Sequence, residues 1–279
     1  MEKNIMQSLF SLKGKRALIT GGTQGIGMAI AKALYLAGAT VVINARNQDK
    51  LNQCIAELST SGEKATGILF DVRNSKSIED GINTIESETG PIDILVNNAG
   101  IIRRAPAEML EEMDWNEVIQ TNLTAPFLVS KKVANYMIRR RRGKIINICS
   151  LMSEIGRDTV SAYAAAKGGL KMLTRNLATE WAAHNIQVNG IGPGFIATPI
   201  NASYREPLNV LNDYILSRTP AGRWGEPDDL IGAAIFLASA ASDFVNGQII
   251  YVDGGLLASF GKPLVQQKQS IGGEARGGH

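Results

Sequence analysis

The chain has 279 residues, of which 44% are hydrophobic and 20% are charged, and its formal net charge is +3. These values are typical of a soluble globular protein that is long enough to bury a sizeable core. So small a net charge gives no indication of a nucleic-acid partner, and no stretch approaches the ~20 apolar residues of a membrane helix.

Short apolar runs alternate along the chain with segments of helical periodicity. Buried strands are expected at residues 16–20, 40–44, 65–70, 92–96, 144–149, 187–191 and 248–252. Helices are expected at residues 25–37, 49–61, 75–88, 114–140 and 159–183. Apolar strands separated by helices indicate parallel strands covered on both faces. The pattern therefore predicts α/β architecture, with a single Rossmann-type doubly wound parallel sheet flanked by helices on both faces.

The same pattern sets the expected domain boundaries. No linker or internal repeat divides the chain before its C-terminal segment, so one dinucleotide-binding and catalytic domain is expected over residues 1–260. Residues 261–279 are rich in Gly, Gln and Lys and are expected to form a loose tail.

A glycine-rich segment joins the first expected strand to the first expected helix. It reads Thr20-Gly21-Gly22-Thr23-Gln24-Gly25-Ile26-Gly27, with the spacing Gly-x-x-x-Gly-x-Gly. Glycines allow a phosphate to approach the backbone closely, and a helix N-terminus attracts its negative charge. A tight structural turn is the simpler explanation, but the position directly after the first strand favours a dinucleotide cofactor.

Tyr163 and Lys167 lie at positions i and i+4 of an expected helix, and therefore on one face of it. An ammonium beside a phenol stabilises the phenolate, which allows the tyrosine to act as an acid or a base. Ser150 lies thirteen positions before Tyr163. A lone Tyr-x-x-x-Lys pair is common on helix surfaces, so its weight comes from the motifs around it.

Taken together, these motifs resemble those of the short-chain dehydrogenase/reductase family. The matching motifs, in the family's order and spacing, are the glycine turn, Asp71-Val72, Asn97-Asn98-Ala99-Gly100, Asn122, Ser150, Tyr163 with Lys167, and Pro193-Gly194 through Thr198. They extend across nearly the whole chain, and their joint occurrence is far more specific than any one of them.

The resemblance implies four catalytic residues. Tyr163 would exchange a proton with the substrate oxygen, and Ser150 would hold that oxygen by a hydrogen bond. Lys167 would support the phenolate and bind the nicotinamide ribose. Asn122 would help to hold a water that links Lys167 to solvent, with a simple bend in its helix as the alternative.

The resemblance also implies a cofactor-binding set. Asp71 would accept a hydrogen bond from the adenine amine, and Asn98 would position the cofactor ribose. The alternatives are that Asp71 ends a strand and that Asn98 satisfies backbone groups. The full set is Gly21, Thr23, Gln24, Gly25, Ile26, Gly27, Arg46, Asp71, Val72, Asn98, Ala99, Gly100, Tyr163, Lys167, Pro193, Gly194, Ile196 and Thr198.

The end of the second expected strand bears on the choice of cofactor. It reads Asn44-Ala45-Arg46, without the Asp or Glu that usually binds the ribose hydroxyls of NAD. Arg46 offers a planar cation that suits a phosphate. We therefore expect NADP (NADPH) rather than NAD, unless Arg46 is merely a solvated loop residue.

Several cations follow the expected nicotinamide side of the site. Arg103 and Arg104 come directly after the Asn97–Gly100 turn, and Arg157 follows Ser150. Cations near a reacting centre suit a carboxylate substrate. These segments resemble the sugar-acid dehydrogenases of the family, which implies Arg104, Ser150 and Tyr163 as substrate-binding residues. Alternatively, the arginines pack a loop or subunit surface.

Two other functions are weighed against a sugar-acid dehydrogenase. A 3-oxoacyl carrier reductase would need a basic docking surface, for which residues 139–142, four consecutive arginines, are a candidate. Those arginines also suit a helix C-terminus, where cations are favourable. A cofactor-binding regulator without turnover would typically lack Tyr163 or Lys167, and both are present.

The remaining expectations concern compartment and assembly. Cys54 and Cys149 are too far apart for a metal-site or redox spacing, so no metal site is expected and Cys149 is interpreted as a buried thiol. No apolar signal-like run follows Met1, and a reducing cytoplasm is expected. The family resemblance implies a homotetramer, with the helices at 114–140 and 159–183 as contact surfaces.

Overall fold

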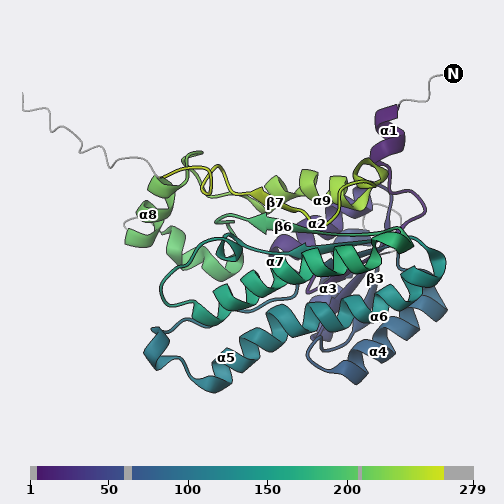
Figure 1. Cartoon of the computed structure of the whole chain (residues 1–279), viewed down its shortest axis with the longest axis horizontal. Coiled ribbons are helices and arrows are strands. Elements are labelled where there is room, and N and C mark those ends of the chain that lie inside the picture. Colours follow the sequence, from purple (N-terminus) through teal and green to yellow (C-terminus); the bar gives the residue numbers. More distant parts are fainter. Residues whose placement is uncertain (1–4, 60–64, 207–208, 261–279) are drawn as a thin grey trace, which may run out of the picture.

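Seven parallel strands form one sheet at the centre of the molecule (Figure 1). The structure is a computed structural model, which describes residues 5–59, 65–206 and 209–260. The strands are β1 (Arg16–Thr20), β2 (Thr40–Ala45), β3 (Thr66–Leu69), β4 (Ile94–Asn97), β5 (Gly143–Ile148), β6 (Ile186–Pro193) and β7 (Ile249–Val252). Their order in the sheet is β3-β2-β1-β4-β5-β6-β7, so the direction of strand succession reverses between β1 and β4.

Alternating side chains of the strands build a core on each face of the sheet. In β1, Ala17 and Ile19 belong to one apolar cluster, whereas Leu18 belongs to the other. This period of two is the geometry of an extended strand. All three side chains are fully buried, as expected for a parallel sheet covered on both faces.

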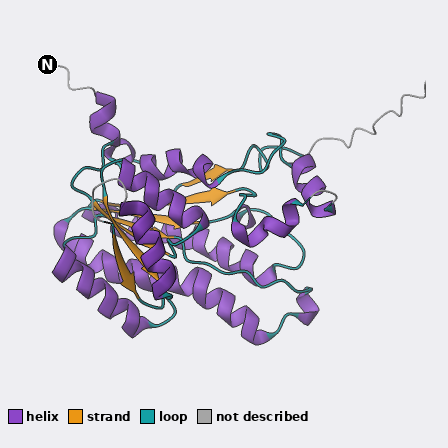
Figure 2. Cartoon of the chain, turned by 180° about the vertical axis from the view of Figure 1, so that it is seen from behind, coloured by secondary structure: helices purple, strands orange, loops and turns teal. Residues whose placement is uncertain are grey.

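Helices cover both faces, as the opposite views of Figures 1 and 2 show. One layer contains α2 (Gly25–Leu36), α3 (Gln48–Leu58) and α9 (Ile231–Ala238). The other contains α4 (Ser75–Thr84), α6 (Ala125–Arg140) and α7 (Ser161–Trp181), with α5 (Glu112–Ile119) packed against α7. The short helix α1 (Ile5–Phe10) precedes β1, and α8 (Val210–Arg218) follows β6. Among the described residues, no helix combines the length and apolarity needed to cross a membrane.

The predicted fold class is confirmed, but the expected helix at residues 114–140 is not continuous. A π-helical turn at Gln120–Thr124 separates α5 from α6. Similarly, the helix expected at 75–88 ends in a π-helical turn at Ile85–Thr89. Single π-turns inside helices are frequently found at functional sites, and the first of these two carries Asn122.

Three helices, α1, α8 and α9, were not expected from the sequence. α9 has the sequence IGAAIFLA, a short run without polar residues, and such a run has no periodicity that distinguishes a helix from a strand. α8 has a weak apolar face, with Ile215 as its buried residue. The end of the helix expected at 49–61 and the tail expected at 261–279 lie outside the described residues.

Candidate active site

A cleft of about 930 Å³ opens at the carboxyl ends of the strands. It lies where the strand order reverses, which is the position where doubly wound sheets bind ligands. The loops after β1 through β6 and the first turns of α7 supply its lining. Every residue of the expected cofactor-binding set lines this cleft, and so do Ser150 and Arg104. Asn122 lies beside the cleft without lining it.

The glycine turn brings the start of α2 unusually close to the strand ends. A Cβ atom on Gly27 would lie 2.4 Å from Nδ2 of Asn98 and 2.6 Å from the carbonyl oxygen of Gly21. Gly21 itself has φ +62°, a conformation that favours glycine. Nδ2 of Asn98 donates to the carbonyl oxygens of Thr20 (3.1 Å) and Gly21 (2.8 Å). A bare backbone at the N-terminus of α2 therefore forms the cleft wall, as a pyrophosphate requires.

Ser150, Tyr163 and Lys167 meet at the other wall of the cleft. Ser150 follows β5, and the other two residues share one face of α7. Lys167 is buried, and its Nζ donates to the carbonyl oxygen of Ile148 at 2.6 Å and lies 5.6 Å from the Tyr163 ring centroid. The hydroxyl of Ser153 donates to the carbonyl oxygen of Lys167 at 2.8 Å, which fastens the segment after Ser150 to α7.

Asn122 uses its side chain to hold the segment that follows β4. Its Oδ1 accepts from the backbone N–H of Ile101 at 2.8 Å, and its Nδ2 donates to the carbonyl oxygen of Ile101 at 2.7 Å. The side chain is fully buried. Asn122 lies in the π-turn Gln120–Thr124, so the irregular turn and the contact with Ile101 occur at the same residue. Its role in holding a water remains a prediction.

The expected adenine end of the cleft is rich in charge. The Arg73 guanidinium donates to Asp71, with an Nη2–Oδ2 distance of 2.9 Å, and this hydrogen bond lowers the pKa of the Asp71 carboxyl below its usual value. Arg46 is exposed after β2, and Lys50 lines the cleft from the first turn of α3. Lys50 was missed by sequence reasoning. A lysine in the first turn is unfavourable because the N-terminal end of the helix dipole is also positive. Its presence there is the signal in the sequence that indicates an anionic ligand.

Arg103 and Arg104 diverge at the opposite end. Arg104 lines the cleft and lies 5.4 Å from the ring centroid of Tyr204, without a hydrogen bond or ion pair to any described residue. Arg103 does not line the cleft, and it pairs with Glu117 (2.7 Å) and Asp114 (3.3 Å). Sequence reasoning missed Tyr204 and Glu117, because neither belongs to a motif.

Arg157 is a third cation near this end. Burial lowers the pKa of its guanidinium, and the neighbouring charge of Arg104 lowers it further. Its one ion pair within the described part of the chain is a 3.9 Å contact with the exposed Asp158. Positive charge is therefore concentrated around Arg104.

Three of the four arginines at 139–142 hold the end of α6, and the two cysteines are buried. Arg140 pairs with Glu86 (2.7 Å), Arg142 pairs with Asp93 (2.8 Å), and Arg141 donates to a backbone carbonyl. The run therefore anchors the end of α6. The two cysteines, Cys54 and Cys149, are buried free thiols, and burial raises the pKa of each to about 11.

A nucleotide cleft with a phenol, an ammonium and a hydroxyl on its wall has the parts needed to move a hydride and a proton together. These features define the class as dinucleotide-dependent oxidoreductases. The family model for short chain dehydrogenases matches residues 15–209, and the chain belongs to this family. It is accordingly an oxidoreductase that acts on a CH–OH group.

Three relatives illustrate how specific the similarity is. The chain is 58% identical to a 2-dehydro-3-deoxy-D-gluconate 5-dehydrogenase from Formosa agariphila, over 91% of this chain and 97% of that protein. It is 48% identical to a 5-keto-D-gluconate 5-reductase from Escherichia coli, over 91% of this chain and 100% of that protein. A solved gluconate 5-dehydrogenase from Burkholderia cenocepacia, in complex with NADP and tartrate, is 47% identical with a TM-score of 0.88, over 91% and 99% of the two chains.

Proposed function

We propose that this enzyme interconverts D-gluconate and 5-keto-D-gluconate with NADP(H). The observation that carries the proposal is Arg104, a guanidinium without a protein hydrogen bond or ion pair within the described residues, which lines the same cleft as Ser150 and Tyr163. A sugar acid combines a carboxylate for such a cation with a hydroxyl for the catalytic residues. The E. coli and Burkholderia relatives carry names for this reaction and support it.

In this proposal each residue of the cleft has a defined task. Arg104 pairs with the carboxylate and thereby sets which hydroxyl reaches Tyr163. The hydroxyl of Ser150 hydrogen-bonds the reacting oxygen, and Tyr163 accepts its proton during oxidation or donates one during reduction. Lys167 stabilises the phenolate by its charge. The nicotinamide, when bound, supplies the hydride for reduction or takes it up in oxidation.

NADP is the proposed cofactor because two cations line the cleft after β2, where we expect the 2′-phosphate to bind. Arg46 and Lys50 both line the cleft after β2, and no acid stands at Asn44 or Ala45. Gly27 allows α2 to pack closely on the strand ends, and this supports binding of the pyrophosphate at the N-terminus of α2. The NADP complex of the Burkholderia relative supports this choice.

A second substrate, 2-dehydro-3-deoxy-D-gluconate, is favoured by the Formosa relative at 58% identity. Both sugar acids carry a carboxylate, and the names of both groups of relatives place the chemistry at carbon 5. Arg104 would therefore serve either substrate. A 3-oxoacyl carrier reductase is less well supported, because Arg140, Arg141 and Arg142 are engaged in holding the end of α6.

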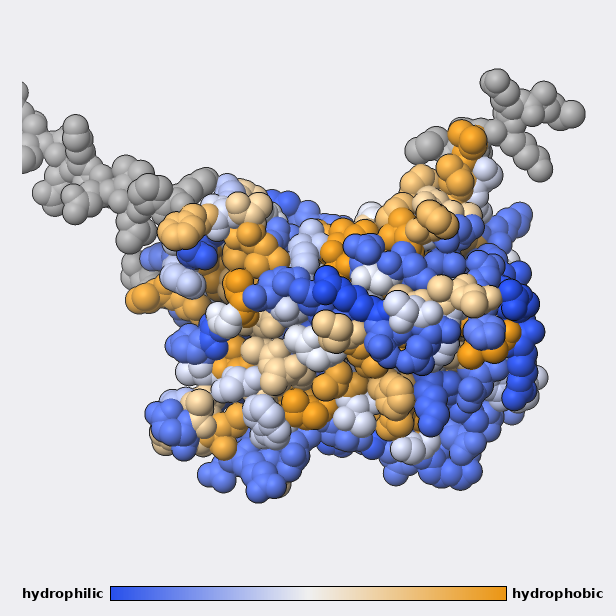
Figure 3. Space-filling view, in the orientation of Figure 1, coloured by the Kyte–Doolittle hydropathy of each residue, from blue (hydrophilic) through white to orange (hydrophobic). Residues whose placement is uncertain are grey.

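We further propose a homotetramer in a reducing cytoplasm. The face formed by α5, α6 and α7 carries exposed apolar side chains, among them Trp115, Phe127 and Met172. Figure 3 shows apolar atoms gathered near the middle of this face, where α6 and α7 lie in Figure 1. Large exposed apolar surfaces mark interaction sites, and a second copy of the chain is the proposed partner. The buried free thiols Cys54 and Cys149 suit a reducing compartment.

The substitution Arg104→Ala tests the proposed substrate. A charge-assisted hydrogen bond contributes about 1.5–3 kcal/mol, so KM for D-gluconate should rise roughly tenfold to a hundredfold while the Kd for NADPH stays unchanged. Arg139→Ala is a matched control, because Arg139 also stacks on a tyrosine (Tyr136) but lies at the far end of α6. Equal turnover of neutral polyols and gluconate by the parent enzyme would contradict the proposal.

A further inference from the structure

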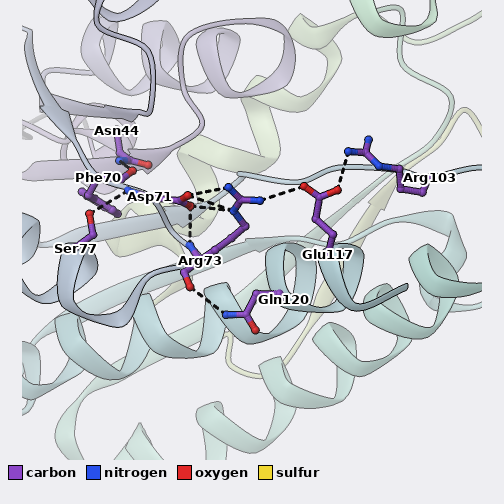
Figure 4. Close-up of polar contacts among 8 residues, drawn as sticks. All are labelled: Asn44, Phe70, Asp71, Arg73, Ser77, Arg103, Glu117 and Gln120. Carbon is purple, nitrogen blue, oxygen red and sulfur yellow. Dashed lines mark hydrogen bonds and ion pairs between the residues drawn. The ribbon is translucent and has the colours of Figure 1, made fainter. Parts of the chain in front are cut away.

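A chain of ion pairs connects the expected adenine end of the cleft with its substrate end (Figure 4). Arg73 Nη2 lies 2.9 Å from Asp71 Oδ2, and Arg73 Nη1 lies 3.1 Å from Glu117 Oε1. Arg103 Nη2 lies 2.7 Å from Glu117 Oε2. The two oxygens of Glu117 thus engage guanidinium groups from two segments, one after β3 and one after β4.

The segment after β4 has few other attachments. Residues 101–105 form neither helix nor strand. Asn122 holds this segment at Ile101, and the N–H of Ala105 donates to the carbonyl oxygen of Thr159 at 3.1 Å. Between these two points, the ion pairs of Arg103 are the polar anchor. Arg103 points toward α5, where it pairs with Asp114 and Glu117. Of the two neighbouring arginines, Arg104 is therefore the one that lines the cleft.

The segment after β3 depends on the same glutamate. Arg73 donates to Asp71 from its backbone N–H (2.9 Å) and from its guanidinium. Its carbonyl oxygen accepts from Nε2 of Gln120 at 3.3 Å. The Asp71 carboxylate is therefore oriented by Arg73, and Arg73 is oriented from the α5 side by Glu117 and Gln120.

We propose that Glu117 is a positioning residue that sets Asp71 and Arg104 together, acting through Arg73 and Arg103. The inference rests on the proposed role of Arg104 as the carboxylate ligand. An acid fits this place, because its carboxylate compensates two guanidinium groups at once. Without it, Arg73 keeps its pair with Asp71 and Arg103 keeps its longer pair with Asp114, but the link between the two segments is lost. Glu117 lines the cleft itself and is 30% exposed, so each pair makes a modest contribution. Its effect is on the placement of two ligand-binding groups.

Four variants of the full-length enzyme separate this role from a general effect on folding. Glu117→Gln keeps the size of the side chain and removes the charge from both pairs. Asp114→Asn weakens the anchor of Arg103 but leaves Arg73 untouched. Glu112→Gln removes the same charge from an exposed position of the same helix that makes no hydrogen bond or ion pair with the described residues. Arg104→Ala supplies the background for a double-mutant cycle.

The readouts are KM and kcat for D-gluconate at saturating NADP, and the Kd for NADPH without sugar acid, measured by fluorescence titration. Glu117→Gln should raise KM about two- to tenfold, with kcat within about twofold, and should raise the Kd for NADPH. Asp114→Asn should raise KM alone, and Glu112→Gln should change neither. Added to Arg104→Ala, Glu117→Gln should change KM by less than about twofold, because it acts through Arg104.

Two results would overturn the inference. One is a Glu117→Gln enzyme with unchanged KM and unchanged Kd for NADPH. The other is a full, independent rise in KM when the substitution is combined with Arg104→Ala. If the parent enzyme turns over no sugar acid, the proposed function is wrong. In that case KM for D-gluconate cannot be measured, and an unchanged Kd for NADPH in Glu117→Gln is sufficient to reject the positioning role.

Discussion

Arg46 is the residue on which the proposed choice of NADP depends most directly. It lines the cleft just after β2, is exposed, and makes no hydrogen bond or ion pair with the described residues. Lys50 adds a second cation from the first turn of α3. Replacing Arg46 by Asp removes one phosphate ligand and introduces an acid that can accept hydrogen bonds from ribose hydroxyls.

The expected effect follows from the number of contacts that are lost. A hydrogen bond to a charged group contributes about 1.5–3 kcal/mol, which corresponds to roughly 10- to 150-fold in Kd. The Kd for NADPH should therefore rise by at least tenfold in Arg46→Asp, and repulsion between the new carboxylate and the 2′-phosphate increases the loss. NADH lacks that phosphate, so its Kd should stay the same or fall.

The assay is fluorescence titration of the parent enzyme and of Arg46→Asp with NADPH and with NADH, at one ionic strength. NADH serves as the internal control for folding and for the rest of the cleft. Lys50→Gln should show the same direction with a smaller change, because a lysine binds phosphate as a point charge without the planar fork of arginine. Equal losses for NADPH and NADH would contradict a contact between Arg46 and the 2′-phosphate and would assign Arg46 a structural role.

Two further predictions concern the catalytic phenol and the thiols. Tyr163→Phe should retain fold and NADPH binding but lose about 10²–10⁴-fold in kcat, and a purified variant with near-normal turnover would remove Tyr163 from the mechanism. Because burial raises the pKa of Cys54 and Cys149 from about 9 to about 11, both thiols stay protonated at pH 8, and a thiol reagent should react with them only after unfolding. Because the pKa of each thiol is higher in the folded protein than in the unfolded chain, the contribution of the two thiols to the free energy of unfolding should be complete below pH 9. It should be lost as the pH rises toward 11. If one thiol per chain reacts rapidly with the reagent in the folded enzyme, the burial of Cys54 and Cys149 is contradicted.

The sequence predicted the sheet and most of the cleft for physical reasons. Parallel strands are buried on both faces, so they stand out as short apolar runs. The glycine turn and the Tyr163–Lys167 pair are local patterns whose geometry depends on residues close in sequence. The glycine turn follows β1, and the Tyr163–Lys167 pair lies in the first turns of α7, the helix after β5. Both therefore lie at the same edge of the sheet, and the structure brings them to one cleft.

What the sequence did not predict depends on contacts between distant segments. Glu117 pairs with Arg73 across 44 positions, and nothing in either segment indicates the other. The π-turn at Gln120–Thr124 arises where Asn122 reaches back to Ile101, so a periodicity count extends one helix through it. Tyr204 lies in a short 3-10 segment, Pro199–Arg205, without a recognisable pattern.

Identification of the product is the most direct test of the proposed activity. The purified enzyme would be incubated with D-gluconate and NADP, and the product would be identified by NMR while NADPH formation is followed by absorbance. We expect 5-keto-D-gluconate in a one-to-one ratio with NADPH, and the reverse reaction from 5-keto-D-gluconate and NADPH. NADPH formation from 2-dehydro-3-deoxy-D-gluconate alone, or no reaction with any sugar acid, would contradict the proposed activity.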